Sequence, residues 1–261
     1  MKLIDTHTHI YLNQFNHDRQ DVIARAANAG VTHMLMPNID SHTAADMLKV
    51  ARAFPESCLP MMGLHPTSVK EYYVTELEVI GSWFEKGKFV AVGETGIDLY
   101  WDKSHKKQQE LSLEQHVDWA LKYDLPLVLH SRNALQELFD VLSPYRQKGL
   151  RGVFHCYPGG VEDAKKVIDM GFLFGIGGVV SYNKSLMAEV VSAIDLEHVI
   201  LETDAPFLAP VPYRGKRNES AYVKNVANKV AEIKGVSPEE VARVTTGNAQ
   251  RLFALPHPVT H

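Results

Sequence analysis

The residues best suited to chemistry in this chain are histidines and carboxylates that follow short apolar segments. A histidine near the end of a strand is, taken alone, more often packed or solvated than bound to a metal. Here, however, such residues recur at the ends of five separate segments. They are His7 and His9 in LIDTHTHI, Glu94 in VAVGETGID, His130 in PLVLHSR, His155 in GVFHCY and Asp204 in VILETDAP. Together they indicate a metal centre.

The number of candidate ligands points to two metal ions. Four histidines and two carboxylates are too many for one tetrahedral ion, and they suit two ions that share a bridging ligand. Glu94 is the expected bridge, because it comes from the middle of the strand order. Nitrogen and oxygen ligands without thiolate fit Mg²⁺, Mn²⁺ or Zn²⁺, and the sequence does not choose among them. We assign one ion to His7, His9, Glu94 and Asp204, and the other to Glu94, His130 and His155.

The elements that must position these residues are eight predicted strands that alternate with helices. Strands separated by helices pair in parallel, and eight such units in 261 residues fit a closed (β/α)₈ TIM barrel, with an open doubly wound sheet as the alternative. A final helix is expected to begin with a capping box at Ser237 and Glu240. The predicted strands cover residues 2–6, 31–36, 58–63, 89–93, 126–129, 151–154, 172–176 and 198–203.

Side-chain alternation along the strands predicts where the metal centre lies. Residues two apart on a strand point to the same side, so His7 and His9 project together. The same rule directs His155 inward and Cys156 outward, which excludes Cys156 as a ligand. In a TIM barrel, the inward face at the carboxyl ends of the strands is the floor of the active site. All six ligands are therefore expected at this end.

Composition limits the class of protein. The chain is 45% hydrophobic and has no linker or internal repeat, which favours a single domain over residues 1–261. Its net charge of -4 argues against binding nucleic acid by bulk electrostatics, but not against a phosphate substrate held by metal ions. Two cysteines, no membrane-spanning stretch and no signal peptide favour a cytoplasmic protein. No obligate protein partner is evident.

Several motifs together resemble one family. DTHTHI, GLHP, VGETGID, PLVLHSR, FHCY, LETDAP and RGKRNES occur in this order and are similar to the TatD family of metal-dependent deoxyribonucleases, which are amidohydrolase-like barrels. The resemblance runs from residue 3 to about residue 253. It implies a (β/α)₈ fold, the same six metal ligands and hydrolysis of phosphodiester bonds in DNA. Glu94 stands where many barrels of the wider superfamily carry a carboxylated lysine, and Asn133 stands where the family often has an acidic residue.

Other residues are candidates for catalysis and for substrate contacts. Asp204 is the expected general base for a metal-activated water, and Glu94 is expected to take part as the bridge. His65 in GLHP is a candidate hydrogen-bond donor to a phosphate oxygen. The RGKRNES motif follows the last strand and contains three cationic side chains, Arg214, Lys216 and Arg217. Such side chains suit phosphate binding.

Two aromatic residues after the fourth strand allow two interpretations. Tyr100 and Trp101 either stack on an exposed base or form an aromatic lid without a role in nucleic-acid binding. Arg132, two residues after His130, is a further candidate for a phosphate contact.

These features favour a nuclease that acts on DNA, expected as an exonuclease on single-stranded ends. A barrel mouth surrounded by loops accepts a frayed strand more readily than a rigid duplex. The alternative is an amidohydrolase or esterase that acts on a small molecule or on the ester of an aminoacyl-tRNA, because it needs the same ligands. A non-catalytic binding barrel is disfavoured, since all six ligands and the candidate base are present.

Overall fold

The computed structural model describes residues 1–183 and 185–255, in which eight strands alternate with helices. The expected single domain over residues 1–261 stays a prediction, because residues 184 and 256–261 lie outside the described range. The elements are β1 (Leu3–Asp5), α1 (Arg19–Asn28), β2 (Val31–Pro37), α2 (Ala44–Ala53), β3 (Cys58–Met61), α3 (Tyr73–Phe84), β4 (Val92–Asp98), α4 (Lys106–Tyr123), β5 (Leu127–Arg132), α5 (Leu135–Leu142), β6 (Gly152–Phe154), α6 (Val161–Asp169), β7 (Phe172–Ile176), α7 (Leu186–Ala193), β8 (Val199–Leu201), α8 (Val223–Lys234) and α9 (Pro238–Phe253).

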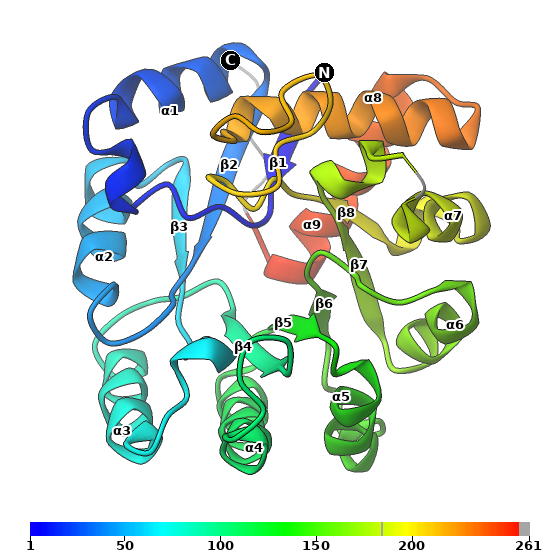
Figure 1. Cartoon of the computed structure of the whole chain (residues 1–261). Coiled ribbons are helices and arrows are strands. Elements are labelled where there is room, and N and C mark those ends of the chain that lie inside the picture. The colour runs from blue at the N-terminus through cyan, green and yellow to red at the C-terminus, as the bar shows by residue number, and fades with distance from the viewer. Residues whose placement is uncertain (184, 256–261) are drawn as a thin grey trace.

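The strands close into a ring of parallel neighbours. Ladders join β1 to β3 and β4 to β8 in chain order. At one seam, the Gly93 amide donates to the Met62 carbonyl oxygen at 2.8 Å, and at the other the Thr6 amide donates to the Leu201 carbonyl oxygen at 3.1 Å. The helices surround this ring (Figure 1). The predicted (β/α)₈ barrel is thus confirmed.

The fourth strand differs from its prediction. The sequence predicted residues 89–93, whereas β4 runs over Val92–Asp98, so Glu94 lies inside the strand and not after it. VGETGID contains glycine and charged residues, so a search for apolar runs does not identify it as a strand. Its backbone nevertheless pairs with β5, as in the match of Gly96 with His130, and every residue of β4 is buried.

One end of the barrel is closed by the last helix. Inside the ring, an apolar cluster unites residues from the strands with Leu252 and Phe253 of α9. The α9 helix begins at the predicted N-cap, because the Ser237 hydroxyl oxygen accepts a hydrogen bond from the Glu240 amide at 3.2 Å. The Glu240 carboxylate accepts from Arg243 instead, so the structure shows one half of the predicted capping box. The members of the cluster that lie on strands are Ile4, Leu35, Met61, Val128, Val153 and Ile200, and Ala91 directly precedes β4.

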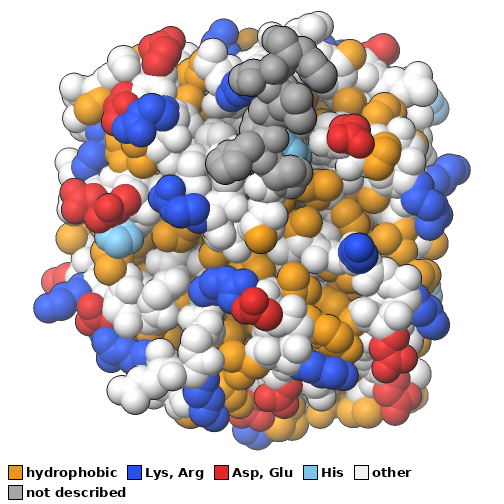
Figure 2. All heavy atoms as spheres, turned by 180° about the vertical axis from the view of Figure 1, so that it is seen from behind, with side chains coloured by type: hydrophobic (Ala, Val, Ile, Leu, Met, Phe, Trp, Pro, Cys, Tyr) orange, Lys and Arg blue, Asp and Glu red, His pale blue; other side chains and the backbone are white. Residues whose placement is uncertain are grey.

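The outer surface on the α9 side mixes charges of both signs. Figure 2 shows Lys, Arg, Asp and Glu side chains interspersed with apolar atoms there, without a large patch of one charge. The opposite end, which faces the viewer in Figure 1, carries the loops that follow the strands. The longest of these loops, residues 202–222, follows β8 and includes the short helix Ser220–Tyr222. Across the part of the chain that the structure describes, no helix is both long and apolar enough to traverse a lipid bilayer.

Candidate metal centre

The six predicted ligands meet at the carboxyl ends of the strands. They come from five places in the barrel, on or just after β1, β4, β5, β6 and β8. The His7 Nε2 atom lies 3.1 Å from Glu94 Oε2, and Asp204 Oδ1 lies 3.5 Å from His9 Nε2 and 3.9 Å from His155 Nε2. The structure therefore brings together the groups that strand alternation and the barrel topology predicted.

Glu94 lies at the middle of the cluster, with only 2% of its surface exposed. Burial alone would raise the pKa of Glu94, but the surrounding histidines, His65 and His7 foremost, hold it well below the ordinary value. Its two oxygens face different histidines, as expected of a carboxylate that bridges two cations. Within 4.0 Å, Oε2 faces His7 and His9, and Oε1 faces His65, His130 and His155.

The donor set fits divalent cations. The possible ligand atoms form three groups whose members lie within 4.8 Å of one another, and imidazole with carboxylate is a donor set for Mn²⁺ and Zn²⁺ as well as Mg²⁺. The buried His7 Nδ1 atom has no hydrogen-bond partner among the described residues. The rings of His7 and His155 stack with centroids 3.5 Å apart. The groups are His7, His155 and Asp204; His7, His9 and Glu94; and His65, Glu94 and His130.

These groups divide the ligands differently from the sequence-based assignment. Asp204 groups with His7 and His155, while His65 joins Glu94 and His130. The partition between two ions therefore stays a prediction. Cys156 belongs to none of the three groups found among the described residues.

Carboxylates behind two of the histidines orient the rings. His130 Nε2 lies 2.9 Å from Asp98 Oδ2, and His155 Nδ1 lies 2.8 Å from Glu202 Oε1. Burial opposes protonation of His155, but Glu202 raises its pKa to about 10. Burial likewise opposes protonation of His130, yet Asp98 and Glu94 raise the pKa of this ring above its usual value. Metal binding at either ring would release a proton, and a carboxylate that holds the far nitrogen favours ligation by the near one.

A tyrosine orients His9 in a comparable way. The Tyr11 hydroxyl donates to the Pro37 carbonyl oxygen at 2.6 Å, so its oxygen is left to accept from His9 Nδ1 at 3.0 Å. The unprotonated Nε2 of His9 then faces the carboxylates of Glu94 and Asp204. Sequence analysis identified neither Tyr11 nor Asp98. Alternation gave a usable signal for Asp98, because Glu94 and Asp98 lie four residues apart on one strand and share a face.

The loop after β8 holds Asp204 in a left-handed backbone conformation, with φ of 57°. The Asp204 amide donates to the His7 carbonyl oxygen at 2.9 Å. The Asn218 side-chain amide donates to the carbonyl oxygens of Thr203 and Phe207, each at 2.7 Å, and so clamps the loop on both sides of Asp204. Part of the RGKRNES motif therefore positions the candidate base.

His65 presents a hydrogen-bond donor to the centre. The Thr67 amide donates to His65 Nδ1 at 3.2 Å, so a neutral ring carries its proton on Nε2, which lies 3.4 Å from Glu94 Oε1. The loop is held by His116, a buried residue of α4. His116 Nδ1 donates to the Ser112 carbonyl oxygen at 2.6 Å, and Nε2 accepts from the Leu64 amide at 2.9 Å.

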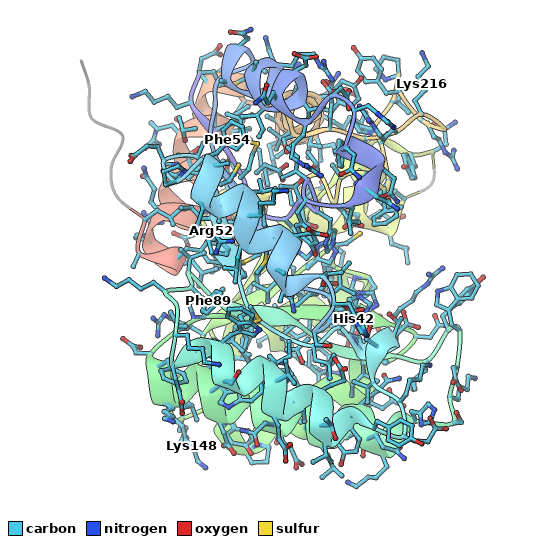
Figure 3. The ribbon with its side chains drawn as sticks, turned by 90° about the vertical axis from the view of Figure 1, so that its left-hand side faces the viewer. His42, Arg52, Phe54, Phe89, Lys148 and Lys216 are labelled. Carbon is cyan, nitrogen blue, oxygen red and sulfur yellow. The ribbon has the colours of Figure 1, made fainter. Side chains whose placement is uncertain are left out.

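The three cations of RGKRNES divide into two kinds. Arg214 lies over the Tyr182 ring, and Lys216 is exposed on the side of the barrel mouth in Figure 3. Neither has an ion-pair partner among the described residues. Arg217 instead forms two hydrogen bonds with the Asp18 carboxylate, at 2.6 and 2.9 Å, and ties the loop to the start of α1.

Asn133 also has a structural explanation. Its φ is 53°, in the left-handed region, which asparagine and aspartate tolerate better than most residues do. Asparagine in place of an acidic residue therefore keeps the backbone that follows β5.

A closed barrel whose mouth gathers histidines and carboxylates around a buried glutamate defines a metal-dependent hydrolase with the amidohydrolase-like fold. The chain belongs to the TatD family, because the family model for TatD-related DNases matches residues 4–254.

Individual relatives agree with this assignment. The chain is 34% identical to the metal-dependent hydrolase YabD of Bacillus subtilis, over 97% of this chain and 99% of the relative. It is 32% identical to the 3'-5' ssDNA/RNA exonuclease TatD of Pantoea ananatis, over 97% of this chain and all of that protein. The crystal structure of YjjV, a TatD homologue from Escherichia coli, superposes with a TM-score of 0.91 at 29% identity and covers 97% of this chain and 98% of its own.

Proposed function

We propose that this protein is a metal-dependent nuclease that removes nucleotides from the ends of single-stranded DNA. The observation that carries the proposal is the cluster around Glu94, which combines a two-metal donor set with the Nε2 donor of His65, 3.4 Å from Glu94 Oε1. The similarity to a relative named as a single-strand exonuclease supports the same substrate class. The expected compartment is the cytoplasm.

The proposed metal ligands are the six residues of the cluster: His7, His9, Glu94, His130, His155 and Asp204. When bound, two divalent cations, Mg²⁺, Mn²⁺ or Zn²⁺, lower the pKa of the attacking water and polarise the phosphate. Glu94 holds both sides of the centre through its two oxygens. Asp204 accepts a proton from the attacking water, and the 14% exposure of its side chain leaves it accessible from the mouth.

The proposed substrate contacts surround the centre. The Nε2–H group of His65 donates to a phosphate oxygen, and Arg214 and Lys216 supply positive charge from the loop after β8. Arg217 has its guanidinium committed to Asp18 and contributes by holding this loop. The ligands lie on a recessed floor, because Glu94, His7 and His9 are all buried. A single-stranded end reaches such a floor more easily than a duplex does.

Nucleotide release tests the proposal. Metal-depleted protein is supplied with Mg²⁺, Mn²⁺ or Zn²⁺ and incubated with a single-stranded oligonucleotide, beside a panel of carboxylic esters and amides. We expect mononucleotides to appear in a metal-dependent manner and to be absent with a Glu94→Ala variant. Cleavage of an ester or amide, without nucleotide release in any of the three metals, would instead support the amidohydrolase or esterase alternative.

A further inference from the structure

We propose that Tyr100, Trp101 and Arg132 form a subsite that binds the nucleotide next to the one at the metal centre, with a base on Trp101 and a phosphate on Arg132. The inference deepens the proposed function and rests on it for the reaction. Its binding component is tested separately.

The three side chains form one exposed cluster at the mouth. Tyr100 and Trp101 follow β4, and their rings meet edge to face with centroids 4.9 Å apart. Arg132 ends β5, and its guanidinium carbon lies 3.8 Å from the centre of the Tyr100 ring and 5.3 Å from that of Trp101. Trp101 is 72% exposed and Tyr100 is 51% exposed. Large aromatic surface left open to water at the mouth of a site indicates a binding surface.

The chemistry of the cluster fits a nucleotide. A guanidinium over an aromatic ring is held by cation–π attraction, while its N–H groups stay free for bidentate contact with a phosphate. Within the described residues, Arg132 has no carboxylate partner. Arg132 lies over Tyr100, whereas Trp101 is mostly open to solvent. Trp101 is therefore the platform for a base, and Tyr100 orients the arginine.

The backbone connects this cluster to the metal centre. Arg132 and His130 are two residues apart on β5, about 7 Å along the strand. The Tyr100 amide donates to Asp98 Oδ1 at 3.0 Å, and the other oxygen of Asp98 contacts His130. The cluster is thus held at a fixed offset from a candidate ligand. A phosphate bound by Arg132 is the neighbour of the phosphate at the centre.

Cations on opposite sides of the mouth favour a polymer over a small ester. Arg132 belongs to β5 and contacts the loop after β4, while Arg214 and Lys216 belong to the loop after β8, which lies across the ring in Figure 1. Because the chain carries a net charge of -4, these local cations must supply the attraction for phosphates that lie outside the metal centre. A strand that crosses the mouth contacts both sides, whereas a small ester occupies only the centre.

Binding and turnover are measured for Trp101→Ala, Trp101→Phe and Arg132→Met in the metal-loaded protein. Binding uses fluorescence anisotropy of a labelled ten-nucleotide oligothymidylate whose phosphorothioate linkages resist cleavage. Turnover compares an ordinary ten-nucleotide oligothymidylate with the dinucleotide. Arg52→Ala is the control for loss of one positive charge, because Arg52 is exposed on α2, away from the mouth side (Figure 3).

We expect Trp101→Ala and Arg132→Met each to weaken binding of the ten-nucleotide strand about tenfold, as loss of one stacked base or one phosphate contact does. Trp101→Phe should recover most of the affinity, and Arg52→Ala should bind like the wild type. The selectivity for the ten-nucleotide substrate over the dinucleotide should fall in Arg132→Met, because the dinucleotide has no second phosphate for Arg132 to bind. Wild-type affinity in Trp101→Ala and Arg132→Met would overturn the subsite and leave the nuclease proposal intact. Weakened binding in a protein that releases no nucleotides would support the subsite and contradict the proposed reaction.

Discussion

The two ends of the barrel use the same strands for opposite purposes. At the α9 end, Val128 and Ile200 pack against Phe253 in an apolar layer. At the mouth, the next residues of these strands lead to a buried carboxylate surrounded by histidines. Apolar packing stabilises the fold, whereas burying charged groups costs free energy unless they are paired. Apolar packing at the closed end therefore offsets the free-energy cost of burying charged groups at the mouth.

Backbone conformation shows the same contrast. Non-glycine residues with positive φ occur after β5, β6 and β8, at Asn133, Cys156 and Asp204. At the α9 end, Asp124 and Ala254 have the same conformation, each as the residue that ends a helix. Sparsely populated conformations concentrate at functional sites. We infer that the mouth is arranged for chemistry and the closed end for stability. Variants at the mouth should therefore change activity, and variants at the closed end should change stability.

The largest effect is expected on turnover at the mouth. Asp204→Asn removes the proposed proton acceptor, so the rate of hydrolysis should fall by about 10²- to 10⁴-fold. The midpoint of thermal unfolding should change little. Asp169→Asn, on the surface of α6, is the matched control and should retain wild-type rates. Rapid hydrolysis by folded, metal-loaded Asp204→Asn would remove Asp204 from the mechanism.

At the closed end, the expected effect is on stability. Phe253→Ala leaves a cavity in the inner apolar layer, which should lower the free energy of unfolding by about 3–5 kcal/mol, as measured by urea denaturation. Metal affinity of the folded protein should stay within twofold of the wild type. Leu186→Ala, at an exposed position, should cost less than about 0.5 kcal/mol. Loss of metal binding in folded Phe253→Ala would show that the two ends are coupled.

His116 makes the stability of the mouth loop depend on pH. Burial lowers the pKa of His116 from 6.5 to about 4, so the unfolded chain binds this proton more tightly than the folded one. The stability that neutral His116 contributes to the folded state is present above pH 6.5. It is lost as pH falls towards 4, which lowers the free energy of unfolding by roughly 3 kcal/mol. His116→Gln keeps an acceptor for the Leu64 amide without a titrating ring. It should lose less stability over this range, as followed by urea denaturation at each pH.

Exposed His42 provides the control for the pH series. His42→Gln should follow the wild-type pH dependence. Parallel curves for His116→Gln and the wild type would contradict the role assigned to the buried ring.

The smallest effect is expected on metal affinity. Glu202→Gln keeps an oxygen for the Cys156 amide, which donates to Glu202 Oε1 at 2.7 Å, but removes the charge that orients His155. Affinity measured by competition with a fluorescent chelator should weaken by about 10- to 100-fold. Exposed Glu197→Gln is the control. Unchanged affinity in Glu202→Gln would mean that the geometry of His155 does not depend on its carboxylate.

The strand order and the convergence of the candidate ligands were predictable because both follow from local patterns. Apolar runs mark strands, and alternation with a closed ring brings their carboxyl ends together. The bounds of β4 were not predictable from the sequence, because glycine and charged residues form a strand there only through pairing with β5. Contacts between distant segments also escaped prediction, as with Arg217 and Asp18, or His116 and Leu64. Such contacts depend on how helices and loops dock, which no local spacing specifies.

Anomalous diffraction from crystals of the Mn²⁺-loaded protein tests the two-metal centre most directly. We expect two peaks at the mouth, both within coordination distance of Glu94, one bordered by His7 and His9 and the other by His130. Peaks that lie away from Glu94, or a single peak on one side of Glu94 at saturating metal, would contradict a two-metal centre bridged by this carboxylate.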